Sequence, residues 1–322
     1  MLNREFIFSN PKIIKWLNKN CIAVVGDNWY RRRAKDEASL WFRSVAQKAG
    51  RGKNGNTQQG SYLTTSQGDL LIFINTSDPD RFLAAMLKGT KKWRQQGKGK
   101  LNIPDMKNPD YTVNVRPIDP AKDIVVEVQS RALTETNGKI TRWDSQGKVG
   151  ADAALGHLWI KQSEWAEFTK GISQLKVGQK LPFPKRITTR IAKFHLIDNT
   201  RGEGPAWKKD EIKTAELHLT KTSKSYKVVG KFNLETKDKS RTFSGALSGN
   251  LVVEKGTPAR PKIWSMTVYG KHSGEGRHTK NARPGAQPLA FTFEFLSDPK
   301  PLDLVPPQHM RWKKGYWEAE RH

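Results

Sequence analysis

Three groups of side chains in this sequence have the residue types that catalysis or ligand binding requires. The first follows a stretch of helical periodicity and consists of His195, Asp198 and Glu203. An imidazole and two carboxylates act as general acid and general base when their surroundings separate their pKa values. The segment also has the composition of an ordinary turn. A hydrolase-type site and a purely structural loop are therefore the two alternatives here.

The second group offers metal ligands at even spacing, namely His272, Glu275 and His278. Imidazole and carboxylate suit zinc or another transition ion. The surrounding segment is rich in glycine and is predicted to be a loop, where regular spacing does not place side chains on one face as it does on a helix. The alternatives are a metal site and a basic loop between strands.

The third group is cationic, and its first part is the run Arg31-Arg32-Arg33. This run is predicted to lie close to the beginning of a long helix. Guanidinium groups beside the free N–H groups of a helix end form an anion site. The alternative is a solvated turn in which Asp36 and Glu37 neutralise the arginines.

The other part of the cationic group is Lys91, Lys92, Trp93 and Arg94. An indole ring can stack on a base or a sugar while the neighbouring cations hold phosphates. The alternative is a solvated helix end, where cations suit the helix dipole. The same mixture of tryptophan and basic residues recurs around Trp29, Trp207 and Trp312.

Overall composition favours a polyanionic partner. The chain of 322 residues has a formal net charge of +26, and the excess of Lys and Arg is spread over its first hundred residues and over residues 151–322. Proteins this basic commonly bind nucleic acid, an acidic polysaccharide or an acidic protein partner. Adaptation for solubility or habitat is the alternative explanation.

Cysteine usage and motif content exclude several classes of protein. Cys21 is the only cysteine, so the chain contains neither an internal disulfide nor a CxxC motif. It opens an apolar run and is predicted to be buried. The sequence contains no GxSxG, Walker A or dinucleotide-binding glycine pattern. We therefore expect no cofactor and no thiol–disulfide exchange.

Targeting signals are equally sparse. No run of about 18 apolar residues is present, so no transmembrane segment is expected. The first residues lack the apolar core of a signal peptide. The sequence as written predicts a cytoplasmic protein, with the mature form of an exported protein as the alternative.

Residues 1–100 are predicted to form a small α/β domain. The hairpin and the last helix have the clearest signals, since Gly68 suits the turn and Asp78-Pro79 suits a helix start. In chain order the expected elements are a helix over residues 10–19, a buried strand over Cys21–Gly26, a helix over Arg31–Ala49, strands at Ser61–Thr65 and Leu70–Ile74, and a helix from Pro79.

This order of elements resembles a thioredoxin-like domain of the bacterial exported type over residues 6–93. The matching features are the leading FSNPKIIKWLNKN helix, the apolar strand Ile22–Val25 and the hairpin TTSQGDLLIF. Arg31-Arg32-Arg33-Ala34 stands where a catalytic thioredoxin has its CxxC, and Gly60-Ser61 stands where the family has a cis-proline. The resemblance implies the fold without the redox activity.

A proline-rich stretch, residues 101–122, is predicted to link this domain to a second one over residues 123–322. The second domain is expected to begin with strands at Asp123–Ser130 and His157–Ile160. Two helices follow, one after Ser163 and one over Pro184–Leu196. Five alternating strands then predict an antiparallel meander, either one curved sheet or a partly closed barrel, with the two helices packed on it.

Leu196–Trp207 and Gly270–Phe295 are similar to a β-rich C-terminal region of planctomycete-type proteins that carry such a thioredoxin-like domain. This resemblance implies architecture only. The expected protein is thus α+β with two domains. Its expected function is binding without catalysis, as a scaffold or recognition protein with a basic surface, while the hydrolase-type site and the metal site stay open as alternatives.

Overall fold

The chain forms two compact units, Met1–Asp110 (unit 1) and Tyr111–His322 (unit 2). The structure is a computed structural model. It describes residues 7–8, 10–26, 28–52, 57–76, 78–95, 118–119, 121–143, 153–254, 259–276, 279, 282–300, 303–304 and 307–321. The predicted linker, residues 101–122, lies outside the described residues except at 118–119 and 121–122.

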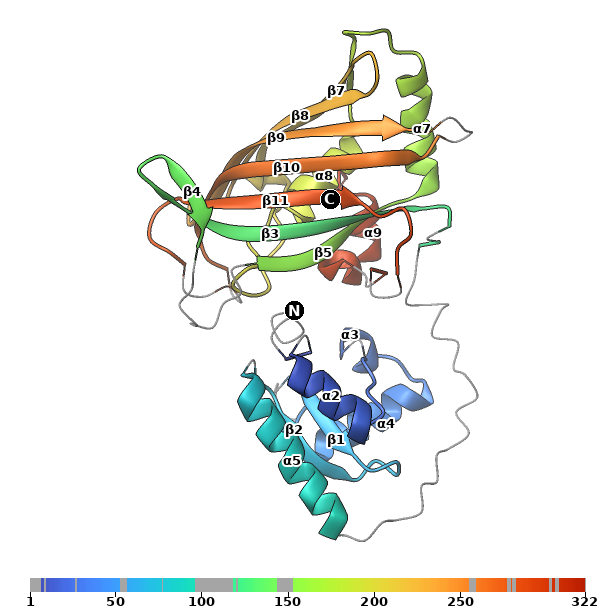
Figure 1. The fold of residues 1–322 in the computed structure, drawn as a ribbon, viewed down its shortest axis with the longest axis vertical. Coiled ribbons are helices and arrows are strands. Elements are labelled where there is room, and N and C mark those ends of the chain that lie inside the picture. The colour runs from blue at the N-terminus through green and yellow to red at the C-terminus, as the bar shows by residue number, and fades with distance from the viewer. Residues whose placement is uncertain are drawn as a thin grey trace. The chain divides into compact units, whose positions relative to one another are not determined.

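Unit 1 is a β-hairpin with helices packed against it (Figure 1). The two strands pair antiparallel with each other. In chain order the elements are α2 (Pro11–Asn20), α3 (Asn28–Arg31), α4 (Glu37–Lys48), β1 (Ser61–Thr64), β2 (Leu70–Ile74) and α5 (Pro79–Gln95).

Local sequence explains where the hairpin turns and where α5 begins. Gly68 has a φ of 82°, which an L side chain rarely adopts. The Asp78 carboxylate accepts hydrogen bonds from the backbone N–H groups of Asp80 at 2.9 Å and Arg81 at 3.1 Å, and Pro79 occupies the first helical position. Both signals were predicted, and both are confirmed.

A small apolar core holds α2 and α5 against the hairpin. Its buried members are Ile7, Ile13, Phe82 and Met86. Phe8 packs edge-on against Phe82, with the ring centroids 5.7 Å apart. The two helices therefore lie side by side over the hairpin, and their opposite sides face solvent (Figure 1).

The buried strand predicted over Cys21–Gly26 is wrong for this structure. The segment is not in a strand, and Ile22, Val24 and Val25 are exposed by 79%, 81% and 78%. Cys21 is half-buried instead of fully buried. Within the described part of unit 1, β1 and β2 pair only with each other, so no strand gives the segment hydrogen bonds and a face to pack on. The thioredoxin-like assignment, which expects this strand, stays a prediction.

Unit 2 combines helices with a curved antiparallel sheet (Figure 1). Its strands are ordered β4-β3-β11-β10-β9-β8-β7-β6, and β5 pairs with β3. Among the described residues, this sheet does not close into a barrel. The elements are β3 (Ile124–Thr136), β4 (Lys139–Arg142), β5 (Ala153–Ile160), α7 (Gln162–Ser173), β6 (Lys180–Pro182), α8 (Lys185–Phe194), η1 (Lys209–Glu211), β7 (Ile212–Lys221), β8 (Tyr226–Glu235), β9 (Arg241–Val253), β10 (Pro261–Gly274), β11 (Gln287–Phe295), η2 (Gln308–Arg311) and α9 (Lys313–Trp317).

The predicted meander is confirmed as β7 to β11, because each strand alternates between core and solvent. In β8, Val228, Phe232 and Leu234 are buried, whereas Lys227 and Lys231 are exposed. A period of two puts these two sets on opposite faces of the sheet. One face is therefore covered by helices and the other carries polar side chains.

Facing glycines let β9 and β10 approach closely. Gly245 lies directly opposite Gly270, and the ring of Phe243 packs over both. A Cβ on Gly249 would clash with the carbonyl oxygen of Ser265. The recurrent glycines on one face thus mark close backbone contact.

The main core lies between the sheet and its two helices. Ile187 and Ile191 of α8 are fully buried against it. Trp165 of α7 packs on Trp264 of β10 with centroids 5.3 Å apart, and its indole N–H donates to the Ala259 carbonyl at 2.7 Å. The predicted two helices are confirmed, and they begin at Gln162 and Lys185.

The C-terminal segment with η2 and α9 forms a second core on the other side of β5. Met310 and Tyr316 pack there with Val125, Trp159 and Phe194. This cluster connects the edge of the sheet to α8 through residues distant in the chain.

One buried arginine joins four elements of unit 2. The Arg190 guanidinium is inaccessible to solvent and binds the Glu164 carboxylate through two N–H groups, at 3.0 and 2.6 Å. Its other bonds go to the backbone carbonyls of Tyr316 at 2.9 Å, Trp159 at 3.0 Å and Trp317 at 2.9 Å. These bonds use all five N–H donors, which is what burial of a guanidinium requires.

Candidate functional site

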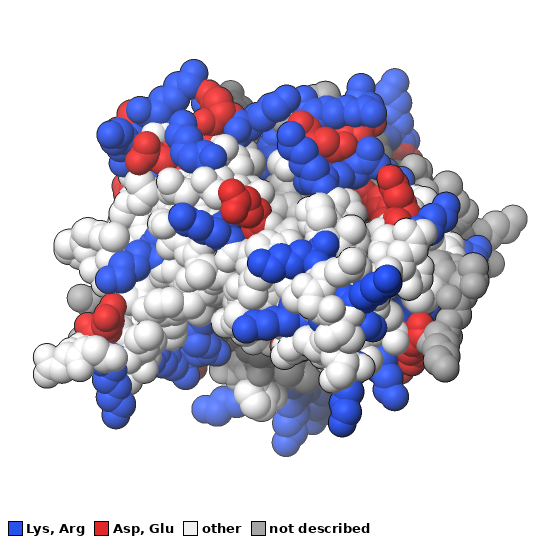
Figure 2. Space-filling model, turned by 90° about the horizontal axis from the view of Figure 1, so that it is seen from above, with Lys and Arg blue, Asp and Glu red and all other residues white. Residues whose placement is uncertain are grey.

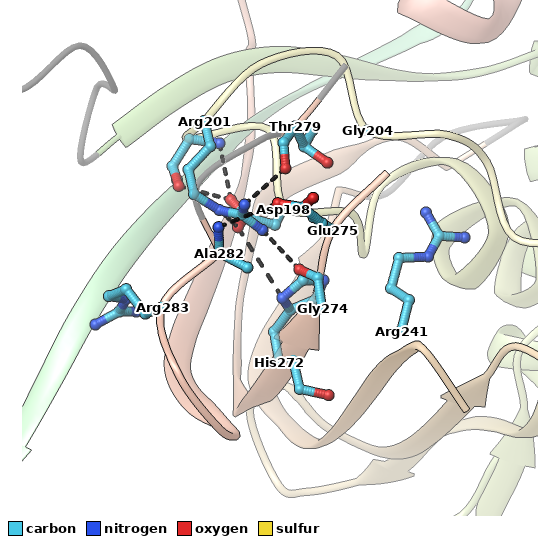
Figure 3. Close-up of polar contacts among 12 residues, drawn as sticks. Asp198, Arg201, Gly204, Arg241, His272, Gly274, Glu275, Thr279, Ala282 and Arg283 are labelled. Atoms are coloured by element: carbon cyan, nitrogen blue, oxygen red, sulfur yellow. Dashed lines mark hydrogen bonds and ion pairs between the residues drawn. The ribbon is translucent and has the colours of Figure 1, made fainter. Parts of the chain in front are cut away.

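The structure brings together one residue from each of two predicted sites. Asp198 follows α8, His272 lies near the end of β10, and Asp198 Oδ2 is 4.0 Å from His272 Nδ1 (Figure 3). The Asp198 carboxylate accepts hydrogen bonds from the Thr200 N–H at 2.9 Å, the Thr200 hydroxyl at 2.6 Å and Arg201 Nε at 2.8 Å. The loop after α8 is therefore fastened to the end of β10.

Arginine side chains complete this fastening. Arg201 donates to the backbone carbonyls of Thr279 at 2.7 Å and Gly274 at 2.8 Å (Figure 3). Arg283 donates to the carbonyl of Leu133 on β3 at 2.5 Å. These guanidinium groups are engaged with backbone oxygens inside the protein, which suits a structural role better than ligand binding.

Burial and the neighbouring cations fix the charges of this cluster. Burial lowers the pKa of His272 to about 4; Asp198 acts in the opposite direction, and Arg201 and other arginines add smaller effects that lower it further. Burial tends to raise the pKa of Asp198, but His272, Arg201 and the bond from Thr200 outweigh it and lower that pKa. At neutral pH the carboxylate is ionised and the imidazole is neutral.

The space next to these residues is small. The hollow lined by Asp198, Arg201, His272 and Arg283 has a volume of about 10 Å³, roughly the room that one water molecule needs. A general acid and base pair must also reach a substrate. The geometry thus supports an anchor between loops more strongly than a hydrolase-type site.

His195 is placed away from the Asp198 cluster, against the C-terminal segment. Its Nε2 lies 3.0 Å from the Tyr316 hydroxyl, which also accepts a hydrogen bond from the Trp159 N–H at 3.2 Å. The buried hydroxyl needs an acceptor for its own proton, and His195 Nε2 supplies it. Burial lowers the pKa of His195 to about 3, so the imidazole is neutral and can accept this proton.

The remaining candidates of these two groups are Glu203, Glu275 and His278. Glu203 is half-buried in the loop after Arg201. Glu275 accepts a hydrogen bond from the Ala282 N–H at 3.4 Å. His278 lies outside the described residues. The structure therefore supplies His272 to a cluster with Asp198, and the predicted metal set of His272, Glu275 and His278 stays a prediction.

One arginine of the predicted run Arg31-Arg32-Arg33 forms an ion pair within unit 1. Arg31 forms an ion pair with Asp36 at 2.9 Å, and Asp36 also caps α4 by accepting from the Ser39 N–H at 2.9 Å. Arg32 and Arg33 are exposed. The beginning of α4 is thus neutralised locally.

A more extensive set of cations lies on α2 and α5, and we call it the cationic face. All of its members are exposed, and none forms an ion pair within the described part of the chain. On α5, Lys92 donates one hydrogen bond to the Leu70 carbonyl at 3.3 Å. The cationic face consists of Lys12, Lys15 and Lys19 of α2 and Arg81, Lys88, Lys91, Lys92 and Arg94 of α5.

Sequence reasoning identified Lys91, Lys92 and Arg94 and missed the rest of this face. Arg81 and Lys88 belong to the same helix, but in the sequence they lie outside the basic run Lys91–Arg94. The spacing of Lys12, Lys15 and Lys19 was a usable signal, because residues three and four apart share one side of a helix. Only packing shows that the two helices adjoin.

The tryptophans beside basic residues differ in exposure. Trp207 is 1% exposed and lies under Arg241, whose guanidinium carbon is 3.8 Å from the ring centroid. Trp93 is half-buried, while Trp312 is 50% exposed. The side chain of Trp29 lies outside the described part of the chain. Trp207 is thus part of the core.

Elsewhere on the molecule, cations and anions are mixed. Figure 2 shows a face on which Lys and Arg side chains lie beside Asp and Glu. Two surface pairs of unit 2 are Lys237–Asp210 at 3.1 Å and Lys271–Glu135 at 3.4 Å. The cations of the cationic face form no such pair among the described residues, and the same holds for some exposed lysines of unit 2, such as Lys227 and Lys231.

The chain matches no protein-family profile, no curated protein sequence and no solved structure. In the part that the structure describes, no helix is both long and apolar enough to cross a membrane.

Proposed function

We propose that this protein binds a polyanion through the cationic face of unit 1 and does not catalyse a reaction on it. The observation that supports this most strongly is that two adjoining helices expose cations without ion-pair partners among the described residues. Grouped cations attract a polyanion because binding releases its condensed counterions.

The dimensions of α5 suit a linear ligand. Arg81 and Arg94 are separated by about 20 Å along the helix axis, since each residue adds about 1.5 Å. Lys88 and Lys91 lie between them on the exposed side. Cations spread over this length of the exposed side of α5 can contact several phosphates or sulfates of one strand. Nucleic acid, acidic polysaccharide and an acidic protein surface are the partner classes that fit.

Hydrogen bonding in unit 2 supports binding rather than catalysis. The acid–base candidates there are engaged with Arg201, Thr200 and Tyr316. A scaffold function, in which unit 1 holds the polyanion, agrees with this arrangement.

Binding of labelled DNA, RNA and heparin at low and at near-physiological salt tests the proposal. We expect binding to one of these polymers to persist at near-physiological salt and to exceed binding to the other two. Equal, weak binding to all three that disappears as salt rises would contradict it, because the net charge alone would then explain the interaction.

A further inference from the structure

A second group of potential metal ligands lies on the β3–β5 edge of unit 2, away from the sites considered above. Glu127 of β3 and His157 of β5 are direct neighbours across the antiparallel pair. Asp303, from the segment after β11, approaches the same place. One ligand atom from each of these three residues lies within 4.8 Å of those from the other two.

The imidazole of this group has an unused ligand atom. His157 is 6% exposed, yet its Nε2 has no hydrogen-bond partner in the described structure. The same atom is 3.9 Å from Asp303 Oδ1. A buried polar atom without a partner is costly and calls for a ligand.

The carboxylates of Glu127 and Asp303 each accept a hydrogen bond from a neighbouring residue. Gln129 donates from its amide to Glu127 Oε1 at 2.7 Å, and the Lys300 N–H donates to Asp303 Oδ2 at 2.6 Å. No lysine or arginine side chain of the described residues pairs with either carboxylate. Hydrogen bonds of this kind orient carboxylate ligands around metal ions.

The neighbouring strand adds a further negative charge. Glu294 of β11 stands directly opposite Glu127 of β3, and like charges in such cross-strand pairs repel each other. In a chain with a net charge of +26, these acidic side chains gather where a cation would relieve their repulsion.

We propose that Glu127, His157 and Asp303 bind one divalent transition cation, of the class of Zn²⁺ or Mn²⁺. An imidazole with two carboxylates suits these ions. Three protein ligands leave coordination positions for water or for an anionic group. Zn²⁺ holds its nitrogen and oxygen ligands at about 2.0–2.2 Å, so the three ligands must draw closer on binding. Asp303 lies outside the sheet, so its segment is the one that strand pairing does not fix.

The protonation state of His157 agrees with this role. Burial lowers its pKa, while Asp303 and Glu127 act in the opposite direction. A lowered pKa favours the neutral imidazole, which is the form that coordinates a metal ion.

Calorimetric titration of chelator-treated full-length protein with Zn²⁺, and separately with Mn²⁺, tests the proposal. We expect one ion per chain, with affinity lowered at least about tenfold in His157→Gln and in Asp303→Asn. His218→Gln and Glu216→Gln change the same residue types on β7 and should leave binding unaltered.

Asp303→Asn is outside the strands, so it decides the matter even where His157→Gln fails to fold. Absence of binding to the wild-type protein, or binding to Asp303→Asn as tight as to the wild type, would overturn the proposal. Because the readout is metal binding, the result is independent of whether unit 1 binds a polyanion.

Discussion

The buried arginines of unit 2 and the exposed cations of α2 and α5 in unit 1 have opposite roles. In unit 2, Arg190, Arg201, Arg241 and Arg283 donate hydrogen bonds to backbone carbonyls within the unit. In unit 1, the lysines and arginines of α2 and α5 face solvent without ion-pair partners among the described residues. A guanidinium inside a protein must satisfy its donors, so it holds segments together. An exposed cation remains available to a ligand.

The two units also differ in their cores. The buried cluster between α2 and α5 in unit 1 has four members, Ile7, Ile13, Phe82 and Met86, whereas the main core of unit 2 extends over most of the sheet and both helices. Since stability rises with buried apolar area, we expect two unfolding transitions in urea, with unit 1 unfolding first. A substitution in one unit should therefore shift one transition and leave the other in place.

The largest effect is expected from removing the buried arginine of unit 2. Arg190→Met leaves the Glu164 carboxylate buried without its partner, so the free energy of unfolding of unit 2 should fall by about 3–5 kcal/mol. Urea unfolding followed by circular dichroism measures this. The transition of unit 1 should not move.

Arg186→Met is the matched control. Arg186 is partly exposed, pairs with Glu320 at 2.9 Å and lies farther from Glu164, at 3.9 Å, so its removal should cost about 1 kcal/mol or less. If both substitutions lowered the free energy of unfolding equally, the burial of Arg190 would not make it more important for stability than the partly exposed Arg186.

A smaller effect is expected from acid. The folded-state pKa of His272 is about 4, below its unfolded value of about 6.5. Between these values the unfolded chain binds a proton that the folded chain excludes. The contribution of His272 to the stability of unit 2 is therefore fully present above about pH 6.5. It decreases by about 1.4 kcal/mol per pH unit as the pH drops toward 4.

Urea unfolding of unit 2 across this pH window checks the effect. His272→Gln should unfold with a shallower pH dependence than the wild type, while His195 keeps its own contribution. An unchanged slope in His272→Gln would mean that the imidazole is not held neutral beside Asp198.

The smallest effect is expected in unit 1. Asp36→Ala removes the cap of α4 and the ion pair with Arg31, and should destabilise unit 1 by about 1 kcal/mol. Asp36→Asn keeps a capping side chain and should destabilise unit 1 by only about 0.3 kcal/mol, because exposed ion pairs contribute little. A large loss in Asp36→Asn would contradict the minor role given to this ion pair.

Features that depend on neighbouring residues were predicted well from sequence. The turn at Gly68, the start of α5 at Pro79 and the alternation of β7 to β11 follow from local backbone preferences and periodicity. The run Cys21–Gly26 shows the limit of such reasoning. Apolar residues make a buried strand only where another strand pairs with them, and sequence pattern alone does not show whether that partner exists.

The candidate sites depend on contacts between distant segments, which one sequence does not reveal. Asp198 and His272 were placed in two separate sites, yet folding brings them together. Glu127 and His157 meet through the register of β3 with β5, and a shift of one residue would separate them. Neither the Asp198–His272 cluster nor the Glu127–His157 pair is marked by a local sequence motif.

The proposed polyanion binding depends most on where the available positive charge lies. An α5 variant, with Lys88→Gln, Lys91→Gln and Arg94→Gln, removes three cations from the cationic face. These residues are exposed, so the fold of unit 1 should be retained. For every phosphate that is no longer neutralised, the slope of log affinity against log salt should fall by about 0.9 on duplex DNA or about 0.7 on a single strand.

The decisive measurement compares this slope with that of a control variant lacking three exposed lysines of unit 2, Lys224, Lys227 and Lys231, each changed to Gln. Both variants have the same net charge. We predict that the slope of the α5 variant is smaller than that of the wild type by about 2 to 3 on the preferred nucleic acid, and that the control stays close to the wild type. Equal decreases in both variants would contradict the account, because the polyanion would then respond to the overall field of the protein and not to the cationic face.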